Sequence, residues 1–230
     1  MSAMAFPIAG QKIIRATPTP LPAPLARPRA VVLPAALPSQ IAANPGEVEG
    51  NVYRNRSHGF EISFPDNWLI TGDDFGDYMR SRGFDLSLKA PEVLSLQNKT
   101  QLDRALKNVT VLLTAFRSLA GSPDNAILRV SIEDLSLLPQ VKDAVDYFDM
   151  MRSQFATMTL PADFKYSDTQ AEKLGRKQFA FIDTNTEAGK KRLYATVKNR
   201  HAIMFTLSYR TDDDLVTMRQ ILAAGNFNIK

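Results

Sequence analysis

The sequence predicts an α+β layered domain with a mainly antiparallel sheet. Apolar residues alternate with polar ones in several short runs, most clearly in the last third of the chain. Other segments space their apolar residues by three and four, as amphipathic helices do. Of the 230 residues 44% are hydrophobic and 23% are charged, which is ordinary for a globular protein and argues against disorder throughout.

The first segment differs in composition from the rest. Residues 1–46 hold nine of the fourteen prolines and four basic residues, and no acidic one. Such a segment cannot build a core and favours extended polyproline II. We therefore predict a proline- and alanine-rich flexible leader or targeting remnant over 1–50 and one folded domain over 51–230. The opening MSAMAFPIAG is similar to the tail of an export signal, so we expect export to the periplasm or cell envelope, with the cytoplasm as the alternative.

Strands are predicted from the alternating pattern. Phe60, Ile62 and Phe64 fall on one face, Pro65-Asp66-Asn67 ends that strand, and Trp68 is a candidate core anchor. Further strands are expected near Leu86 and from Ile127, the latter with Leu128, Val130 and Ile132 facing inward.

Three strand-like runs follow one another in the last third. They are QFAFID (178–183), KRLYATVKN (191–199) and HAIMFTLSY (201–209), separated by turn residues at 184–189 and 198–200. In the last run Ile203, Phe205, Leu207 and Tyr209 share one face. Because the connections are short, an antiparallel meander is expected.

Three helices are predicted between and after these strands. The first covers 100–121, the second about 141–158, and the third the segment DDDLVTMRQILAAG. Asp212–Asp214 are expected to cap the third helix. The expected buried residues are, in the first helix, Leu102, Leu106, Val109, Leu113, Phe116 and Ala120; in the second, Val145, Phe148, Met151 and Phe155; and in the third, Leu215, Met218 and Leu222.

Composition excludes several kinds of chemistry. Without cysteine there are no disulfides, thiol nucleophiles or thiolate metal sites, and with two histidines any metal site would need mostly carboxylate ligands. Asp73, Asp74 and Asp77 cluster but lack the spacing of a calcium loop, so we predict a solvated loop. Glycine-rich phosphate-binding fingerprints are absent too. No metal and no cofactor is predicted.

Basic residues give the strongest surface signal. Between 173 and 200 lie Lys173, Arg176, Lys177, Lys190, Lys191, Arg192, Lys198 and Arg200, against Asp183 and Glu187. We predict that Lys190, Lys191, Arg192, Lys198 and Arg200 gather at one end of the sheet and bind a protein partner with an acidic surface. The alternative is a solvated rim that keeps the sheet edge soluble.

Other partners are not predicted. Nucleic-acid binding would need exposed aromatic rings among the cations, and Tyr194 is one candidate ring. Apolar runs are shorter than the roughly 20 residues of a membrane-spanning helix. A monomer is expected.

The stretch YRNRSHGFEISFPDNW, from Tyr53 to Trp68, resembles the opening hairpin of PsbP-like domains. The meander, last helix and closing GNFNI (225–229) are similar to that family as well, so the resemblance covers about 51–230. It implies an α/β/α sandwich, no catalysis, and docking on a larger partner; the family includes extrinsic subunits of photosystem II, a Ran-binding import factor and exported bacterial proteins. The segment after Trp68 departs from the photosystem proteins, which argues against a photosystem role.

The leading hypothesis is a non-enzymatic, exported accessory or binding domain that docks on a larger protein. One alternative is a small-molecule hydrolase built around His58 or His201 in a cleft. Ser57 and His58 are adjacent, but neighbours in a strand point to opposite faces. Another alternative is a carrier with a small apolar pocket lined by residues such as Phe179 and Met204.

Overall fold

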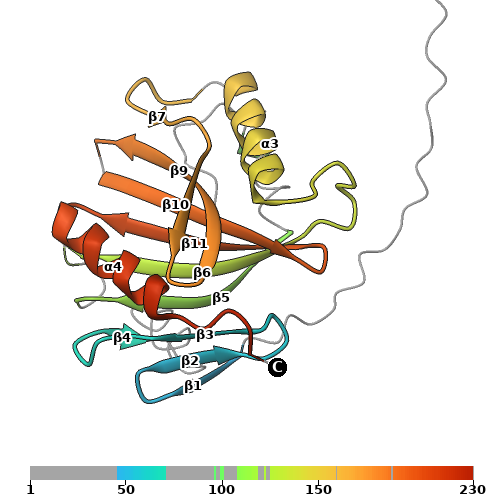
Figure 1. Cartoon of the computed structure of the whole chain (residues 1–230). Coiled ribbons are helices and arrows are strands. Elements are labelled where there is room, and N and C mark those ends of the chain that lie inside the picture. Colours follow the sequence, from blue (N-terminus) through green and yellow to red (C-terminus); the bar gives the residue numbers. More distant parts are fainter. Residues whose placement is uncertain are drawn as a thin grey trace, which may run out of the picture. The chain divides into compact units, whose positions relative to one another are not determined.

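The computed structural model describes residues 46–70, 96, 99–100, 108–118, 122, 125–158, 160–187 and 189–229. All of them belong to the compact unit Gln40–Lys230. Their strands form two antiparallel sheets, one of eight strands and one of three, with helices α3 and α4 beside them (Figure 1).

The large sheet has the strand order β4-β5-β6-β11-β10-β9-β7, and β8 also pairs with β9. Every one of these pairings is antiparallel. The strands are β4 (Leu69–Ile70), β5 (Val109–Phe116), β6 (Ile127–Asp134), β7 (Lys165–Tyr166), β8 (Gln170–Leu174), β9 (Lys177–Thr186), β10 (Gly189–Lys198) and β11 (His201–Tyr209). The predicted meander is thus confirmed as β9, β10 and β11, and the strand from Ile127 as β6.

A two-residue turn joins β10 to β11. Lys198 pairs with His201, and the two residues between them, Asn199 and Arg200, have φ of 49° and 62°. Positive φ at both central residues is typical of the type I′ hairpin turn, whose twist suits antiparallel strands. Asparagine adopts this conformation more readily than most residues, which explains how the sequence makes the turn without glycine.

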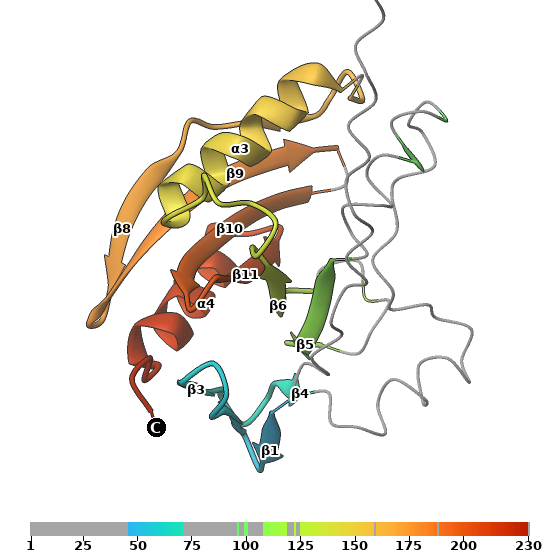
Figure 2. The ribbon, with the colours of Figure 1, turned by 90° about the vertical axis from the view of Figure 1, so that its right-hand side faces the viewer.

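The large sheet buries both faces. Along β9, Phe179 and Phe181 belong to one apolar cluster, whereas Ala180 and Ile182 belong to another. The first cluster contains Met218, Ile221 and Leu222 of α4 (Asp212–Ala224), and the second contains Tyr147 and Phe148 of α3 (Ala144–Thr157). Figure 2 shows α3 lying over β9 and β10. One helix on each face makes an α/β/α sandwich, as expected.

The small sheet is β1 (Glu47–Glu49), β2 (Val52–Asn55) and β3 (Phe60–Ser63) in that order. Phe60, Ile62 and Phe64 are buried on one face and Trp68 is 6% exposed, which confirms the predicted alternation and anchor. The first strand begins at Glu47, a few residues upstream of the predicted boundary at 51. The division of the chain at 50 stays a prediction.

The C-terminal segment joins the two sheets. Backbone groups of Glu61 and Asn226 exchange two hydrogen bonds of 2.8 and 2.9 Å, one in each direction. Next to this bridge the Phe227 ring lies 5.2 Å from that of Phe179 and 5.8 Å from that of Phe205, measured between centroids. The segment predicted to close the fold therefore does so with one bridge and one aromatic ring.

The helix predicted over 100–121 is wrong over residues 108–118, because 109–116 form β5, although Thr100 is helical. From Leu112 to Phe116 every residue is buried, so the strand shows no alternation, and spacings of three and four fit by chance. The β-branched residues Val109, Thr110 and Val111 favour a strand and were the available signal. Residues 101–107, the strand near Leu86 and the aspartates at 73, 74 and 77 lie outside the described residues.

The other two helices are confirmed with corrections. The N-cap of α4 is Thr211, whose hydroxyl accepts from the Asp214 N–H in a capping box; Asp212–Asp214 occupy the first turn. In α3, Phe148 is buried as predicted, but Val145 is 43% exposed and Tyr147 takes the inward position.

Tyr147 makes a buried polar contact between α3 and the large sheet. Its hydroxyl donates a 2.6 Å hydrogen bond to Glu133 Oε2 on β6. Burial raises the pKa of Glu133, and the Tyr147 hydrogen bond partly opposes that rise. A buried carboxylate without its donor would keep the cost of lost hydration, so the hydroxyl stabilises the ionised folded state.

We predict that Tyr147→Phe lowers the free energy of unfolding by about 1–3 kcal/mol at pH 7, because Glu133 loses its donor. The folded-state pKa of Glu133 lies above its unfolded value, so the folded carboxyl takes up its proton first as pH falls. The loss should therefore shrink toward pH 4.5 in urea titrations. The control is Tyr166→Phe at a tyrosine that is 36% exposed; an equal loss there, or a pH-independent one, would contradict the argument.

Candidate functional site

The five predicted partner-binding cations do not form one patch. Lys190, Lys191 and Arg192 lie at the start of β10, whereas Lys198 ends it and Arg200 is in the following turn. Eight residue steps of extended strand separate Lys190 from Lys198, about 27 Å at the usual rise. The prediction that they gather at one end of the sheet is wrong, because the two turns bounding a strand lie at its opposite ends.

Two of the three cations at the first end are paired. Lys190 Nζ lies 3.4 Å from Asp212 Oδ1, and Lys191, also exposed, falls on the opposite side of the strand. Arg192 binds Asp183 with two atoms, at 2.7 Å (Nε to Oδ1) and 2.8 Å (Nη2 to Oδ2), and its guanidinium lies 4.3 Å from the centre of the Phe181 ring. The Arg192 guanidinium is therefore held by contacts within the same chain.

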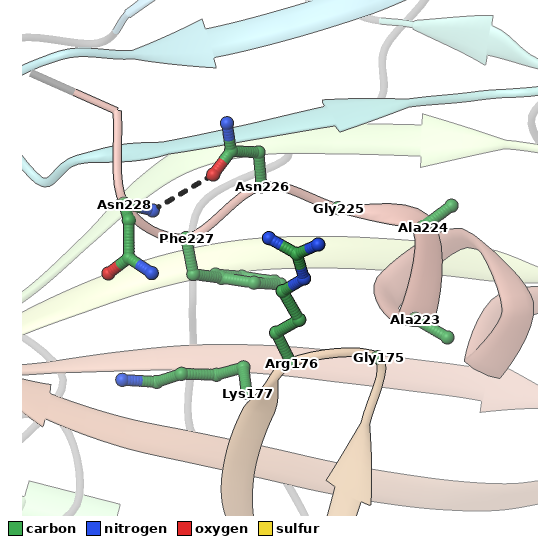
Figure 3. A pocket seen from close by; sticks show the side chains of 9 residues that line it. All are labelled: Gly175, Arg176, Lys177, Ala223, Ala224, Gly225, Asn226, Phe227 and Asn228. Carbon is green, nitrogen blue, oxygen red and sulfur yellow. Dashed lines mark hydrogen bonds between the residues drawn. The ribbon is translucent and has the colours of Figure 1, made fainter.

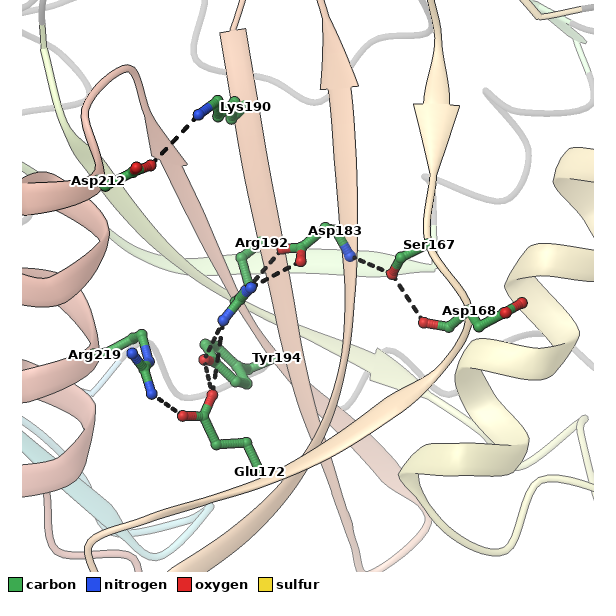
Figure 4. A network of polar contacts seen from close by, with 9 residues as sticks. All are labelled: Ser167, Asp168, Glu172, Asp183, Lys190, Arg192, Tyr194, Asp212 and Arg219. Carbon is green, nitrogen blue, oxygen red and sulfur yellow. Dashed lines mark hydrogen bonds and ion pairs between the residues drawn. The ribbon is translucent and has the colours of Figure 1, made fainter.

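Glu172 of β8 extends this arrangement into a network. It accepts hydrogen bonds from the Tyr194 hydroxyl and from Arg219 of α4, and Arg192 Nη1 lies 3.8 Å away (Figure 4). Tyr194 is fully buried rather than the exposed ring that the sequence suggested. Burial and the contact with Glu172 raise its pKa to about 12. The network ties β8, β10 and α4 together, which is a structural task.

The opposite end of the meander carries unpaired positive charge. We define the basic end as Arg176, Lys177, Lys198 and Arg200, which come from the β8–β9 turn, the start of β9, the end of β10 and the β10–β11 turn. Among the residues that the structure describes, none of these four forms an ion pair. Lys198 Nζ donates to the His58 carbonyl at 3.3 Å, and Arg200 Nη1 donates to the Val141 carbonyl at 3.3 Å. A backbone carbonyl carries no net charge, so neither hydrogen bond is an ion pair.

One carboxylate lies near the basic end. Asp134 is paired across the sheet with His201. Two hydrogen bonds from Ser136 lower the pKa of Asp134, and the charges of His201 and Arg200 lower it further. At Lys177, partial burial and the nearby charge of Lys198 lower the pKa of the ammonium. The two lysines are thus close enough to repel each other.

A pocket of about 480 Å³ opens beside these cations. Arg176 and Lys177 line one side, and Asn226, Phe227 and Asn228 line the other (Figure 3). Asn226 Oδ1 accepts from the Asn228 backbone N–H at 3.1 Å, so the Asn226 amide nitrogen remains as a donor. None of the described residues that line this pocket carries a carboxylate, and its charged and amide donors suit an anionic group.

The two histidines lie far apart in the sequence and close together in the fold. The centroids of the His58 and His201 rings are 5.7 Å apart, His58 in the turn between β2 and β3 and His201 at the start of β11. His201 Nδ1 lies 2.8 Å from the Asn199 carbonyl oxygen. Among the described residues neither ring hydrogen bonds to a serine or a carboxylate, so no triad is formed there. Nothing in the sequence spacing signals that these two rings meet.

The apolar carrier hypothesis required one cavity lined by Phe179 and Met204. These residues lie on opposite faces of the large sheet, Phe179 in the cluster with α4 and Met204 against the cluster with α3. The Phe179 ring packs on the rings of Tyr194, Phe205 and Phe227. That part of the prediction is wrong, because residues 179 and 204 cannot share a pocket across a sheet.

The described ranges lack two further features. They contain no cluster of three or more histidine, aspartate or glutamate side chains placed to hold a metal ion. None of the helices described there has the length and apolarity needed to cross a bilayer.

Gly175 sets the shape of the pocket rim. Its φ is +58°, and a Cβ added there would lie 2.1 Å from the Ala223 carbonyl oxygen at the end of α4. Only glycine lets the β8–β9 turn approach the helix so closely, because both the conformation and the space exclude a side chain. Gly50 has the same φ of +58° with nothing within 4 Å of the added Cβ, and offers a matched comparison.

We predict that Gly175→Ala lowers the free energy of unfolding by at least about 2 kcal/mol, while Gly50→Ala costs about 1 kcal/mol. The backbone conformation is common to both positions, so the difference isolates the contact with Ala223. Chemical denaturation of the two variants in parallel measures it. Equal losses would mean that the turn does not rest on α4.

Comparison with known proteins gives structural likeness alone. No protein-family model matches the chain, and no curated protein matches it. One similar solved structure is the solution structure of cyanobacterial PsbP (CyanoP) from Synechocystis sp. PCC 6803, with 16% identity, a TM-score of 0.41, and 79% of this chain and 95% of that chain covered.

Another is a crystal structure from Bacteroides thetaiotaomicron VPI-5482, with 9% identity and a TM-score of 0.40. That match covers 78% of this chain and 48% of the other. At these identities and scores no function is transferred. The first of these structures carries the name of the family that the Tyr53–Trp68 stretch resembles. The fold assigned to this chain, α+β with mainly antiparallel sheets, rests on its own strand order and helices.

Proposed function

We propose that this protein is a non-enzymatic accessory domain, exported to the periplasm or cell envelope, which docks on an acidic surface of a protein partner through the basic end. The single observation that carries the proposal is the contrast between the two ends of β10. Arg192 and Lys190 are neutralised by Asp183 and Asp212, whereas Lys198 and Arg200 face no carboxylate within ion-pair distance among the described residues.

Unpaired cations favour docking for a physical reason. At Lys190 or Arg192 an ion pair with a partner would have to replace an internal pair, so little would be gained. At the basic end the same contact adds an attraction without breaking one, and it steers the approach of an acidic surface. Of the five residues predicted from sequence we therefore retain Lys198 and Arg200 in the docking surface and add Arg176 and Lys177.

The arrangement also gives the surface some rigidity. Lys198 is half-buried and bonded to the His58 carbonyl, and Arg200 is bonded to backbone carbonyls. Side chains already held in place lose less conformational entropy on binding than free ones do. The pocket beside Arg176 and Lys177 would accept a carboxylate side chain of the partner.

We predict that Arg176→Glu combined with Lys177→Glu weakens partner binding about tenfold or more and makes it less sensitive to salt, because two attractive charges are reversed. A photo-crosslinking residue at position 176 identifies the partner in an envelope fraction, and calorimetry with the purified partner gives the affinity. The control is Lys165→Glu combined with Lys190→Glu, which makes the same charge change elsewhere. Equal weakening by the control pair would place docking at another surface.

Export predicts a second observable. Protein recovered from the envelope of its native host should have lost its leader at a point before Glu47, because β1 begins there and pairs with β2. Intact-mass measurement of protein from separated envelope and cytosolic fractions tests this. Recovery of the uncut chain in the cytosol alone would overturn the proposed location and leave the docking surface to be tested separately.

A further inference from the structure

The two histidines of the chain, His58 and His201, are placed against each other. Their ring centroids are 5.7 Å apart and their planes are inclined by 59°. They come from different sheets, since His58 belongs to the turn that joins β2 to β3 and His201 opens β11. Neither the core nor the basic end requires imidazole at these positions.

The distance suits one metal ion held between the rings. Imidazole nitrogen binds zinc at about 2.0–2.1 Å, and the ring centre lies ~1.1 Å farther out, so two rings on a tetrahedral ion have centres about 5.2 Å apart. A linear arrangement would separate them by about 6.4 Å on the same bond length. The observed 5.7 Å lies between these values, so the separation of the rings allows both to reach one ion.

The hydrogen bond of His201 fixes which nitrogen is free. Its Nδ1 lies 2.8 Å from the Asn199 carbonyl oxygen, which can only accept a hydrogen bond. Nδ1 therefore carries the proton and Nε2 offers its lone pair. Histidines that ligate metals almost always donate their other ring N–H to a carbonyl or carboxylate in this way.

The backbone around both rings is held firmly. The His58 N–H donates to Asn55 Oδ1 at 3.0 Å, and the His58 carbonyl accepts from Lys198 at 3.3 Å. Asn55 is fully buried. His201 is paired in the sheet with Lys198 on one side and Asp134 on the other. Two imidazoles mounted on fixed backbone form a clamp that loses little freedom when an ion binds.

Charged side chains near the two rings include one that repels a metal cation and one that attracts it. The Lys198 ammonium repels a cation, and the Asp134 carboxylate across from His201 attracts one. Neutral imidazole is the form that binds metals. Arg200 and Lys177 add positive charge farther along the same end.

We propose that His58 and His201 together bind one divalent late first-row transition ion, with water completing its coordination. Neutral imidazole donors suit Cu(II), Ni(II) and Zn(II) and do not suit magnesium or calcium, and Cu(II) should bind most tightly. The ion would join the β2–β3 turn of the small sheet to the β10–β11 hairpin of the large sheet. This inference rests on the ring geometry and is independent of the proposed docking function.

The experiment uses the full chain without an affinity tag, titrated with Cu(II) and with Zn(II). Because these are the chain's two histidines, imidazole nitrogens seen by pulsed electron paramagnetic resonance of the copper form can come from no other side chain. We expect one ion per chain with two imidazole ligands. Zn(II) at a hundredfold excess over its Kd should raise Tm by about 5 °C or more.

The variants His58→Gln and His201→Gln should each leave one imidazole signal, weaken copper binding on the order of 10²-fold and abolish the Zn(II) shift of Tm. Lys198→Gln is the companion variant, and it should tighten binding because a repelling charge is removed. Copper signals without imidazole nitrogen, or affinity unchanged in either histidine variant, would overturn the proposal. Thermal unfolding without metal checks that each variant is folded.

Discussion

Burial of both faces of the meander is the constraint on which the rest of the structure depends. In β9, Phe179 packs toward α4 while Ala180 packs toward α3, and β10 and β11 alternate in the same manner. A charge in the middle of such a strand would lose its hydration on either side, so it must be paired or displaced to a turn. Arg192 is paired with Asp183, and most other cations of this region lie at strand ends.

That constraint separates the cations into two groups with different properties. Where α4 and β8 cover the sheet, Glu172 accepts hydrogen bonds from Tyr194 and Arg219 and lies close to Arg192. The opposite charges of these side chains neutralise one another. At the other end the covering elements present backbone carbonyls, which accept hydrogen bonds from Lys198 and Arg200 without cancelling their charge. The charge left unpaired at each end of β10 thus depends on what covers that end, rather than on the number of basic residues near it.

The sequence predicted the features that depend on local pattern. It missed those that depend on which distant elements pack against one another. Alternation gave β3, β6 and the meander, because each has a recognisable apolar face. It failed for β5, since Leu112–Phe116 are buried on both faces and carry no period. The separation of Lys190 from Lys198 follows from hairpin geometry, so it could have been predicted from the sequence. The pairing of Arg192 and the meeting of His58 with His201 were not, because contacts between distant segments leave no trace in spacing.

The meeting of the two histidines depends on the C-terminal segment. Asn226 bonds to Glu61 of β3, and Phe227 fills the space between the rings of Phe60, Phe179 and Phe205. This closure holds the β2–β3 turn against the β10–β11 hairpin, where Lys198 meets the His58 carbonyl. The same residues therefore bring together the free charges, the pocket and the two imidazoles. Because the apolar contacts of Phe227 fix this geometry, the polar groups at this end remain available for binding.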